Sequence, residues 1–122
     1  QSFYSGSLEK LKEFAPEAPR VYLIVPETIK VEGGWDKLLD TAARLGNGIG
    51  PVGYMCWPWK VGDAHRRGLV VHPFTLNEAW MFRTITFFGA DGFFTDKCHV
   101  LAEYYGRKPV KSPDEILAAH GY

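Results

Sequence analysis

The sequence lacks both an excess of charge of one sign and any long apolar run. Its 122 residues carry 14 basic and 14 acidic side chains, so the formal net charge is zero. That balance argues against a nucleic-acid partner, because phosphates attract a strongly basic surface. No run approaches the roughly 18 apolar residues that a membrane-spanning helix needs. We therefore expect neither nucleic-acid binding nor a membrane span.

Cysteine is scarce, and the common nucleotide-binding motifs are missing. Cys56 and Cys98 are too few for a disulfide framework, and we expect free, mostly buried thiols. The chain contains no Gly-x-Gly-x-x-Gly and no phosphate-cradling lysine motif. Its four histidines have no carboxylates at ligand spacing, so the sequence predicts no metal site made by this chain alone.

What is present is a composition that can bury a core and a regular alternation of patterns. Hydrophobic residues make up 46% of the chain and aromatic residues 15%, which is typical of one folded domain or part of one. Apolar periodicity predicts helices over residues 8–14, 35–45, 61–67, 78–88, 97–105 and 113–120. Short apolar runs predict strands over residues 20–25, 69–74 and 92–95, and residues 1–3 are expected to end a further strand.

Three segments between these patterns are harder to assign. Residues 48–51 fit either a loop or a degenerate strand, residues 26–34 are expected to form a loop, and residues 54–59 an aromatic loop. Polar residues that precede helical patterns are expected to act as N-caps; these are Ser7, Asn77, Asp96 and Ser112.

Strands that alternate with helices indicate parallel β/α units, so the predicted class is α/β. Without a nucleotide-binding motif, a (β/α)8 TIM-type barrel is favoured over a doubly wound sheet. A complete barrel needs about 200 to 250 residues, whereas this chain holds about four and a half units. The sequence therefore predicts a barrel whose first strands are missing.

Three stretches have a recognisable order and spacing. The first is Gln-Ser-Phe at residues 1–3, followed by Ser-Leu-Glu-Lys-Leu at residues 7–11. The second covers residues 64–77 and contains His-Pro-Phe-Thr, and the third is Gly-Ala-Asp-Gly-Phe-Phe-Thr-Asp at residues 89–96. Together with residues 48–51 they resemble the fourth, seventh, eighth and sixth strand regions of glycerophosphodiester phosphodiesterases. The resemblance covers the chain to about residue 105.

This resemblance implies the carboxy-terminal part of the barrel, about strands 4 to 8, in residues 1–106, with a tail and short helix in residues 107–122. It implies a metal-dependent hydrolase that releases glycerol 3-phosphate and an alcohol from a small glycerophosphodiester. The family's catalytic histidines and metal-binding carboxylates lie upstream of the Gln-Ser-Phe strand, and no residue here matches them. We therefore expect no catalytic acid or base in this chain, and a divalent metal, Ca or Mg, held by residues outside it.

Four residues are candidate substrate contacts. Phe74 stands at the family position of an aromatic side chain that lines the glycerol side of the pocket, although a purely structural core role is also open. Gln1 and Phe3 would stand at the end of the fourth strand, and Gln1 could hydrogen-bond near the phosphate. Strand alternation puts His72 on the face of Phe74, where a satisfied interior histidine is the alternative to a catalytic one.

The expected partner follows from the missing strands. A half barrel exposes two sheet edges and its apolar interior, so we expect an amino-terminal fragment of the same enzyme, as in a nicked or truncated protein, or self-association. A non-catalytic half-barrel module for assembly or ligand binding is the alternative. A related lipid phosphodiesterase, such as a phospholipase D-like toxin, is a third reading, which the His-Pro-Phe-Thr stretch disfavours. Localisation stays open; resemblance to periplasmic and plant-type members favours a periplasmic or secreted protein.

Overall fold

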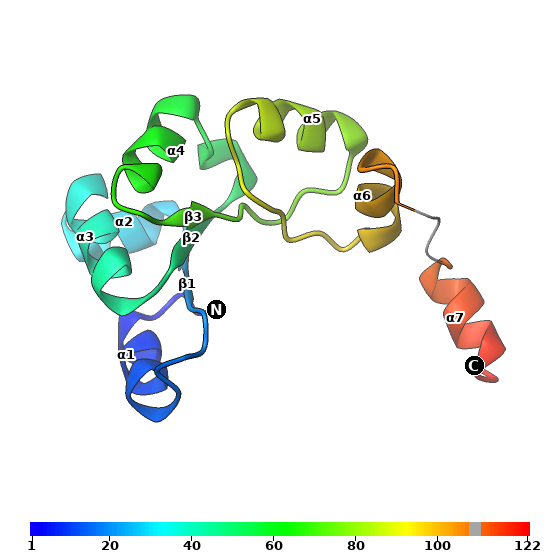
Figure 1. Ribbon diagram of the computed structural model, residues 1–122, viewed down its shortest axis with the longest axis horizontal. Coiled ribbons are helices and arrows are strands. Elements are labelled where there is room, and N and C mark those ends of the chain that lie inside the picture. The colour runs from blue at the N-terminus through cyan, green and yellow to red at the C-terminus, as the bar shows by residue number, and fades with distance from the viewer. Residues whose placement is uncertain (108–110) are drawn as a thin grey trace.

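The computed structural model describes residues 1–107 and 111–122, and its centre is a small parallel sheet (Figure 1). Strands β1 (Val21–Ile24), β2 (Gly48–Pro51) and β3 (Val70–Val71) lie in the order β1-β2-β3. Both strand pairs are parallel, and Ile49 of β2 stands beside Tyr22 on one side and Val71 on the other. Residues 48–51 are therefore the central strand, although the sequence fitted a loop there equally well.

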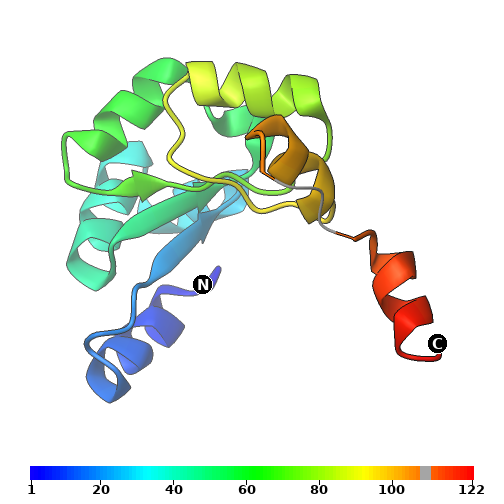
Figure 2. The same cartoon turned by 45° about the vertical axis from the view of Figure 1, so that its right-hand side comes forward.

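Helices follow each strand, as the sequence predicted. They are α1 (Ser5–Phe14), α2 (Pro26–Glu32), α3 (Trp35–Leu45), α4 (Pro58–His65), α5 (Ala79–Phe87), α6 (Cys98–Tyr104) and α7 (Pro113–Ala119), with a 3-10 turn η1 (Gly53–Met55) after β2. Helices α3, α4 and α5 lie along one side of the sheet, and the chain begins next to the β1 edge (Figure 2). None of the helices in the described ranges combines the length and apolar character needed to cross a membrane.

Two further segments extend the sheet beyond its regular strands. Ser2 forms a parallel bridge with Tyr22, which places residues 1–3 beside β1. Residues 92–95 lie beside the continuation of β3, where the Phe94 N–H donates to the Pro73 carbonyl at 2.9 Å and the Leu76 N–H donates to the Phe94 carbonyl at 3.2 Å. The predicted strand at 92–95 is wrong as a regular strand, because these two hydrogen bonds do not continue into a ladder with the segment after β3 within the described residues.

The core lies between the sheet and the helices. Tyr22, Ile24, Ile49 and Val71 belong to one buried cluster with helical residues such as Phe82, which is completely buried. Because side chains alternate along a strand, Val71 in this core places His72 on the opposite, inner face of the sheet. The same alternation continues along the chain, so the inner face also receives Phe74.

Some local predictions were wrong. Residues 26–34 contain α2, because Pro26 stands at its first position, the Thr28 hydroxyl accepts from the Val25 N–H at 3.3 Å, and Gly33 ends it with a φ of 81°. Helix α4 begins at Pro58, inside the expected aromatic loop, for the same N-terminal reason. The remaining predicted helices agree with the structure within a few residues.

Of the four predicted N-caps, three are wrong and one is confirmed. Ser7 lies inside α1, and α5 and α6 are preceded by Glu78 and Lys97 as their N-cap residues, so the capping roles predicted for Ser7, Asn77 and Asp96 are wrong. Ser112 does cap α7 through a reciprocal capping box with Glu115. The tail therefore contains the predicted short helix, whereas residues 108–110 of that tail lie outside the described part of the chain.

Candidate functional site

The carboxyl ends of the parallel segments meet along one rim of the sheet, which is where barrel enzymes place their active sites. Phe3 and Phe74 stand at this rim and come from segments far apart in the sequence. Their rings lie 5.6 Å apart between centroids, edge to face at 87°. Phe3 is 42% exposed and Phe74 is half-buried. The structure thus brings together two of the four candidate substrate contacts.

The other two candidates lie to either side of this pair. Gln1 is exposed at the beginning of the chain. His72 lies one step deeper than Phe74 on the inner face, and its ring packs edge-on to Phe94 with 6.1 Å between centroids. Gly92 leaves little room beside this imidazole: a Cβ there would lie 3.0 Å from Cδ2 and 3.1 Å from Nε2, so the ring would have to shift by a few tenths of an ångström. Within the described residues no carboxylate forms a hydrogen bond or ion pair with His72.

The loop after β2 closes onto the end of β3 beside Phe74. The Gly53 N–H donates to the Phe74 carbonyl at 2.6 Å, and Val52 forms a parallel bridge with Phe74. A Cβ at Gly53 would lie only 2.4 Å from Cδ2 of Leu76, so glycine permits this close approach. These contacts fix the backbone that presents Phe74 to the inner face.

A polar network joins two rim loops. The Asn77 side-chain carbonyl accepts from the Thr95 hydroxyl at 2.9 Å and from the Asp96 N–H at 3.0 Å, and its amide donates to the Asp96 carboxylate at 3.0 Å. An ion pair between Lys97 and Glu78 at 3.0 Å lies beside it. Asn77 and Asp96 were expected to cap two separate helices, and the one sequence feature they share is that each follows a predicted strand.

The rim does not fit a metal ion by itself. The Asp96 carboxylate accepts a hydrogen bond from the Asn77 amide. No group of three or more His, Cys, Asp or Glu side chains in the described residues could hold a metal. Burial raises the pKa of the Cys56 thiol to about 12, with the Asp91 charge as a smaller cause, so this thiol stays protonated and is no nucleophile. Cys98 is also free but exposed, so only one of the two thiols is buried as predicted.

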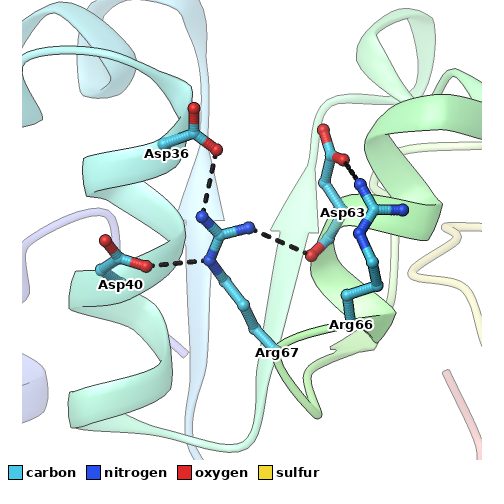
Figure 3. A network of polar contacts seen from close by, with 5 residues as sticks. All are labelled: Asp36, Asp40, Asp63, Arg66 and Arg67. Carbon is cyan, nitrogen blue, oxygen red and sulfur yellow. Dashed lines mark hydrogen bonds and ion pairs between the residues drawn. The ribbon is translucent and has the colours of Figure 1, made fainter.

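A second group of ionic contacts, apart from the Lys97–Glu78 pair at the rim, surrounds the end of α4 at the opposite end of the sheet. Arg67 joins α3 to the end of α4: it pairs with Asp36 at 3.0 Å and with Asp40 at 2.8 Å, and it donates to the Asp63 carbonyl (Figure 3). The hydrogen bond that Arg67 donates to the Asp40 carboxylate is the main cause that raises the pKa of the Arg67 guanidinium. Arg66 pairs with the Asp63 carboxylate in the same network. In a barrel, this end serves stability rather than chemistry.

His65 and Asp91 also lie at that end, as expected from their places before β3 and before residues 92–95. The His65 Nε2 and Asp91 Oδ2 atoms are 2.9 Å apart, and the same oxygen accepts from the Val71 N–H at 2.7 Å. Asp91 thus holds the beginning of the last sheet segment against β3.

Comparisons with known proteins support the architecture. No protein-family model and no curated protein matches the chain. Solved structures do match: one from Silicibacter pomeroyi, assigned as a glycerophosphoryl diester phosphodiesterase, has a TM-score of 0.68 at 24% identity over 89% of this chain. Another with the same assignment, from Agrobacterium tumefaciens, has a TM-score of 0.72 at 20% identity over 86% of this chain.

The chain spans only 39% and 42% of the length of these two structures. The predicted fold, part of a (β/α)8 barrel, is therefore confirmed, and so is the resemblance to structures of this assignment. At this level of identity the likeness concerns the fold, and activity has to be argued separately.

Proposed function

We propose that this chain supplies the carboxy-terminal part of a metal-dependent phosphodiesterase that hydrolyses glycerophosphodiesters to glycerol 3-phosphate and an alcohol. The observation that carries the proposal is the shared fold with two structures of that assignment, together with aromatic residues at the matching rim. Phe74 and Phe3 would pack against the carbon face of the glycerol. Gln1 would lie near the phosphate and His72 would support the pocket from beneath.

The catalytic acid and base and the divalent metal, Ca or Mg, would come from outside this chain. Support comes from the rim, where the described side chains pair with one another and form no metal-binding group. When bound, such a metal would polarise the phosphodiester. This chain's own contribution would be to position the glycerol and to exclude water from one side of the pocket.

The partner would be the amino-terminal part of the same enzyme, lying along both open edges of the sheet. Residues 1–3 and 92–95 are each paired on one side only. Next to the first edge, Tyr4 is 75% exposed, although large apolar side chains are usually covered. Beside the second edge, a cavity of about 580 Å³ opens between Gly92 and Leu101 of α6.

The same open edges favour a second candidate, a non-catalytic half barrel that pairs with another copy of itself. Isolated sheet edges readily pair with each other. The two candidates predict different assemblies: the first is a metal-dependent hydrolase made with the amino-terminal part, and the second is a homodimer that does not hydrolyse the substrate.

The experiment is to combine the chain with the amino-terminal part of the barrel and to measure hydrolysis of glycerophosphocholine with Ca²⁺ or Mg²⁺. We expect turnover that needs both polypeptides and stops with a chelator. Phe74→Ala should raise KM about tenfold, as expected for the loss of roughly 50 Å² of apolar contact. Phe87→Ala, which removes a ring that is 87% exposed on α5, serves as the matched control. Absence of hydrolysis from a well-formed complex would reject the proposal.

A further inference from the structure

An aromatic surface lies on the helical side of the sheet, where the segment after β2, the beginning of α4 and helix α5 meet. Figure 2 shows α4 and α5 running along this same side. Three of the four tryptophans of the chain belong to the surface. We call it the aromatic patch, and its members are Tyr54, Trp57, Trp59, Trp80, Phe87 and Phe88.

The rings of the aromatic patch form one continuous surface. Trp57 stacks on Trp59 with 5.3 Å between centroids and on Phe88 with 6.2 Å. The Phe87 ring lies 6.3 Å from that of Phe88. The two remaining rings border the same hollow as Trp57, which has a volume of about 380 Å³. The patch is therefore a single area and not a set of isolated exposed side chains.

Helix α5 contributes to the patch because it is apolar on two faces. Phe82 and Ile85 are buried in the core. Trp80, Thr84 and Phe87 are spaced four and three residues apart, which places them together on the opposite face. Trp80 is 64% exposed and Phe87 is 87% exposed. A helix that met only water on this face would carry polar residues there.

The exposed area of the patch is large for a single chain. With about 200 Å² for each fully exposed ring, the five most exposed members present about 650 Å² of aromatic surface. The largest apolar patch on a typical monomer is about 300 to 600 Å². Completing the barrel would not cover it: an amino-terminal part would lie along the edges at residues 1–3 and 92–95, whereas α4 and α5 follow β2 and β3 between those edges.

The unpaired charges beside the patch are basic. Arg83 is exposed on the outer face of α5 and forms no ion pair within the described residues. Lys60, which follows the tryptophans of α4, likewise has no carboxylate partner in the described part of the chain. The acidic side chains of α4 and of the α5 N-cap, Asp63 and Glu78, are each paired with a basic residue. The patch is therefore an apolar surface with net positive charge around it.

This combination fits a lipid surface better than a second copy of the chain. Tryptophan and tyrosine rings favour the headgroup level of a membrane. A long basic side chain such as Arg83 can reach the lipid phosphates while the neighbouring rings enter the apolar layer. A two-fold contact between two copies of α5 would instead bring Arg83 close to the same residue of the other copy, where the like charges repel.

We propose that the aromatic patch docks the protein on an anionic lipid surface. Trp57, Trp80 and Phe87 enter the boundary between headgroups and acyl chains, and Arg83 binds the phosphates. The docking is peripheral, because the protein lies on the surface and no helix crosses it. The proposal concerns attachment alone and does not rest on the proposed function.

The first test measures binding of the full 122-residue chain to vesicles of phosphatidylcholine mixed with phosphatidylglycerol, by co-sedimentation. Phe87→Ser should lower the partition coefficient about tenfold, as expected if roughly 60 Å² of the ring leaves water. Tyr4→Ser is the matched control, because it removes a ring that is 75% exposed next to the open β1 edge. It should change binding less than twofold. Equal losses in the two variants would overturn the proposal, since the open edges would then contact the lipid.

The second test examines the charge. Arg83→Gln should lower binding to the mixed vesicles about fivefold, because one basic residue near an anionic surface contributes about 1 kcal/mol. On vesicles of phosphatidylcholine alone the same change should have less than a twofold effect. An equal effect on both kinds of vesicle, or none on either, would overturn the assignment of an anionic surface.

A measurement on the unchanged protein keeps the proposal testable if a variant does not fold, which thermal unfolding reports. Tryptophan emission should shift to shorter wavelength on vesicle binding, and brominated phosphatidylcholine should quench it, because three tryptophans lie in the patch. Absence of both effects would overturn the proposal. So would self-association that Trp80→Ser abolishes, observed without any vesicle binding, because a second copy would then be the occupant.

Discussion

Replacing Arg20 should lower the stability of the fold without changing substrate binding. This residue is the rare case of an arginine that is only 6% exposed and bonds to carbonyl groups alone. Its Nε donates to the Leu45 carbonyl at 2.7 Å, and its Nη1 lies 2.6 Å from the Ala18 carbonyl. The same Nη1 reaches two further carbonyls, those of Ala15 and Pro16, at 3.1 and 3.0 Å. One side chain therefore ties the end of α3 to the turn after α1.

The expected loss for Arg20→Met follows from these bonds. A hydrogen bond from a charged donor contributes about 1.5 to 3 kcal/mol, and an abandoned buried carbonyl carries a further penalty. Nη1 has two protons for three carbonyl acceptors, and those carbonyls are partly exposed to water. We therefore count the four contacts of the guanidinium as about two full hydrogen bonds. Recovery of the guanidinium's hydration in the unfolded chain offsets part of this. The net loss of unfolding free energy should be about 2 to 3 kcal/mol.

The assay is urea unfolding of the assembled protein, followed by far-ultraviolet circular dichroism, with Arg20→Lys beside Arg20→Met. Lysine keeps the charge but cannot reach both groups of carbonyls, so it should lose about half as much. Because Arg20 precedes β1, at the end of the sheet away from the rim, KM for substrate should not change. A loss below about 0.5 kcal/mol for Arg20→Met would refute the reasoning, since the carbonyls would then be satisfied by water.

Three further predictions concern packing and ionisation. Gly46→Ala should destabilise the fold by about 2 kcal/mol in urea unfolding, because its Cβ would lie 2.4 Å from the Arg20 carbonyl oxygen. Gly6→Ala in α1, where the new Cβ would have nothing within 4 Å, should be neutral or stabilising, and equal effects of the two changes would refute the steric argument. Burial, with help from Glu32, raises the pKa of Tyr22 to about 12, above its ordinary value of 10.0, so the protonated form stabilises the fold below pH 10 and this contribution disappears as pH rises towards 12. Tyr22→Phe should flatten that part of the stability profile, and an unchanged slope would contradict the assignment. The Cys56 thiol should resist iodoacetamide in the folded protein at mildly alkaline pH and react on unfolding, as mass spectrometry of the labelled peptides can check; rapid native labelling would contradict its burial.

Much of the fold could be predicted from the sequence because the barrel repeats a simple pattern. The run at residues 20–25 and the amphipathic stretch at residues 35–45 carry their structures in local periodicity, and they form β1 and α3. Central strand β2 was harder, because Gly48–Pro51 has low intrinsic strand preference and is extended only by pairing on both sides. Residues 92–95 show the converse: their apolar pattern suits a strand, but their two hydrogen bonds to residues 73–76 do not form a regular ladder.

The site was predictable in part. Alternation along the strand places His72 and Phe74 on one face, which required only the period of two. The contact between Phe3 and Phe74 could not be predicted from the sequence. The two residues are 71 positions apart, and their contact depends on how the sheet curves. Asn77 and Asp96 each looked like a local cap, and only the adjacency of their loops makes them partners of one another.

The central claim is that this chain completes its barrel with an amino-terminal part of the same enzyme, and native mass spectrometry tests it most directly. The chain is mixed with that part and the masses of the complexes are recorded, with glycerophosphocholine hydrolysis measured on the same sample. A one-to-one complex that hydrolyses the substrate only with divalent metal is the predicted result. A chain that stays at 13.8 kDa, or that pairs only with itself and shows no hydrolysis, would contradict the account.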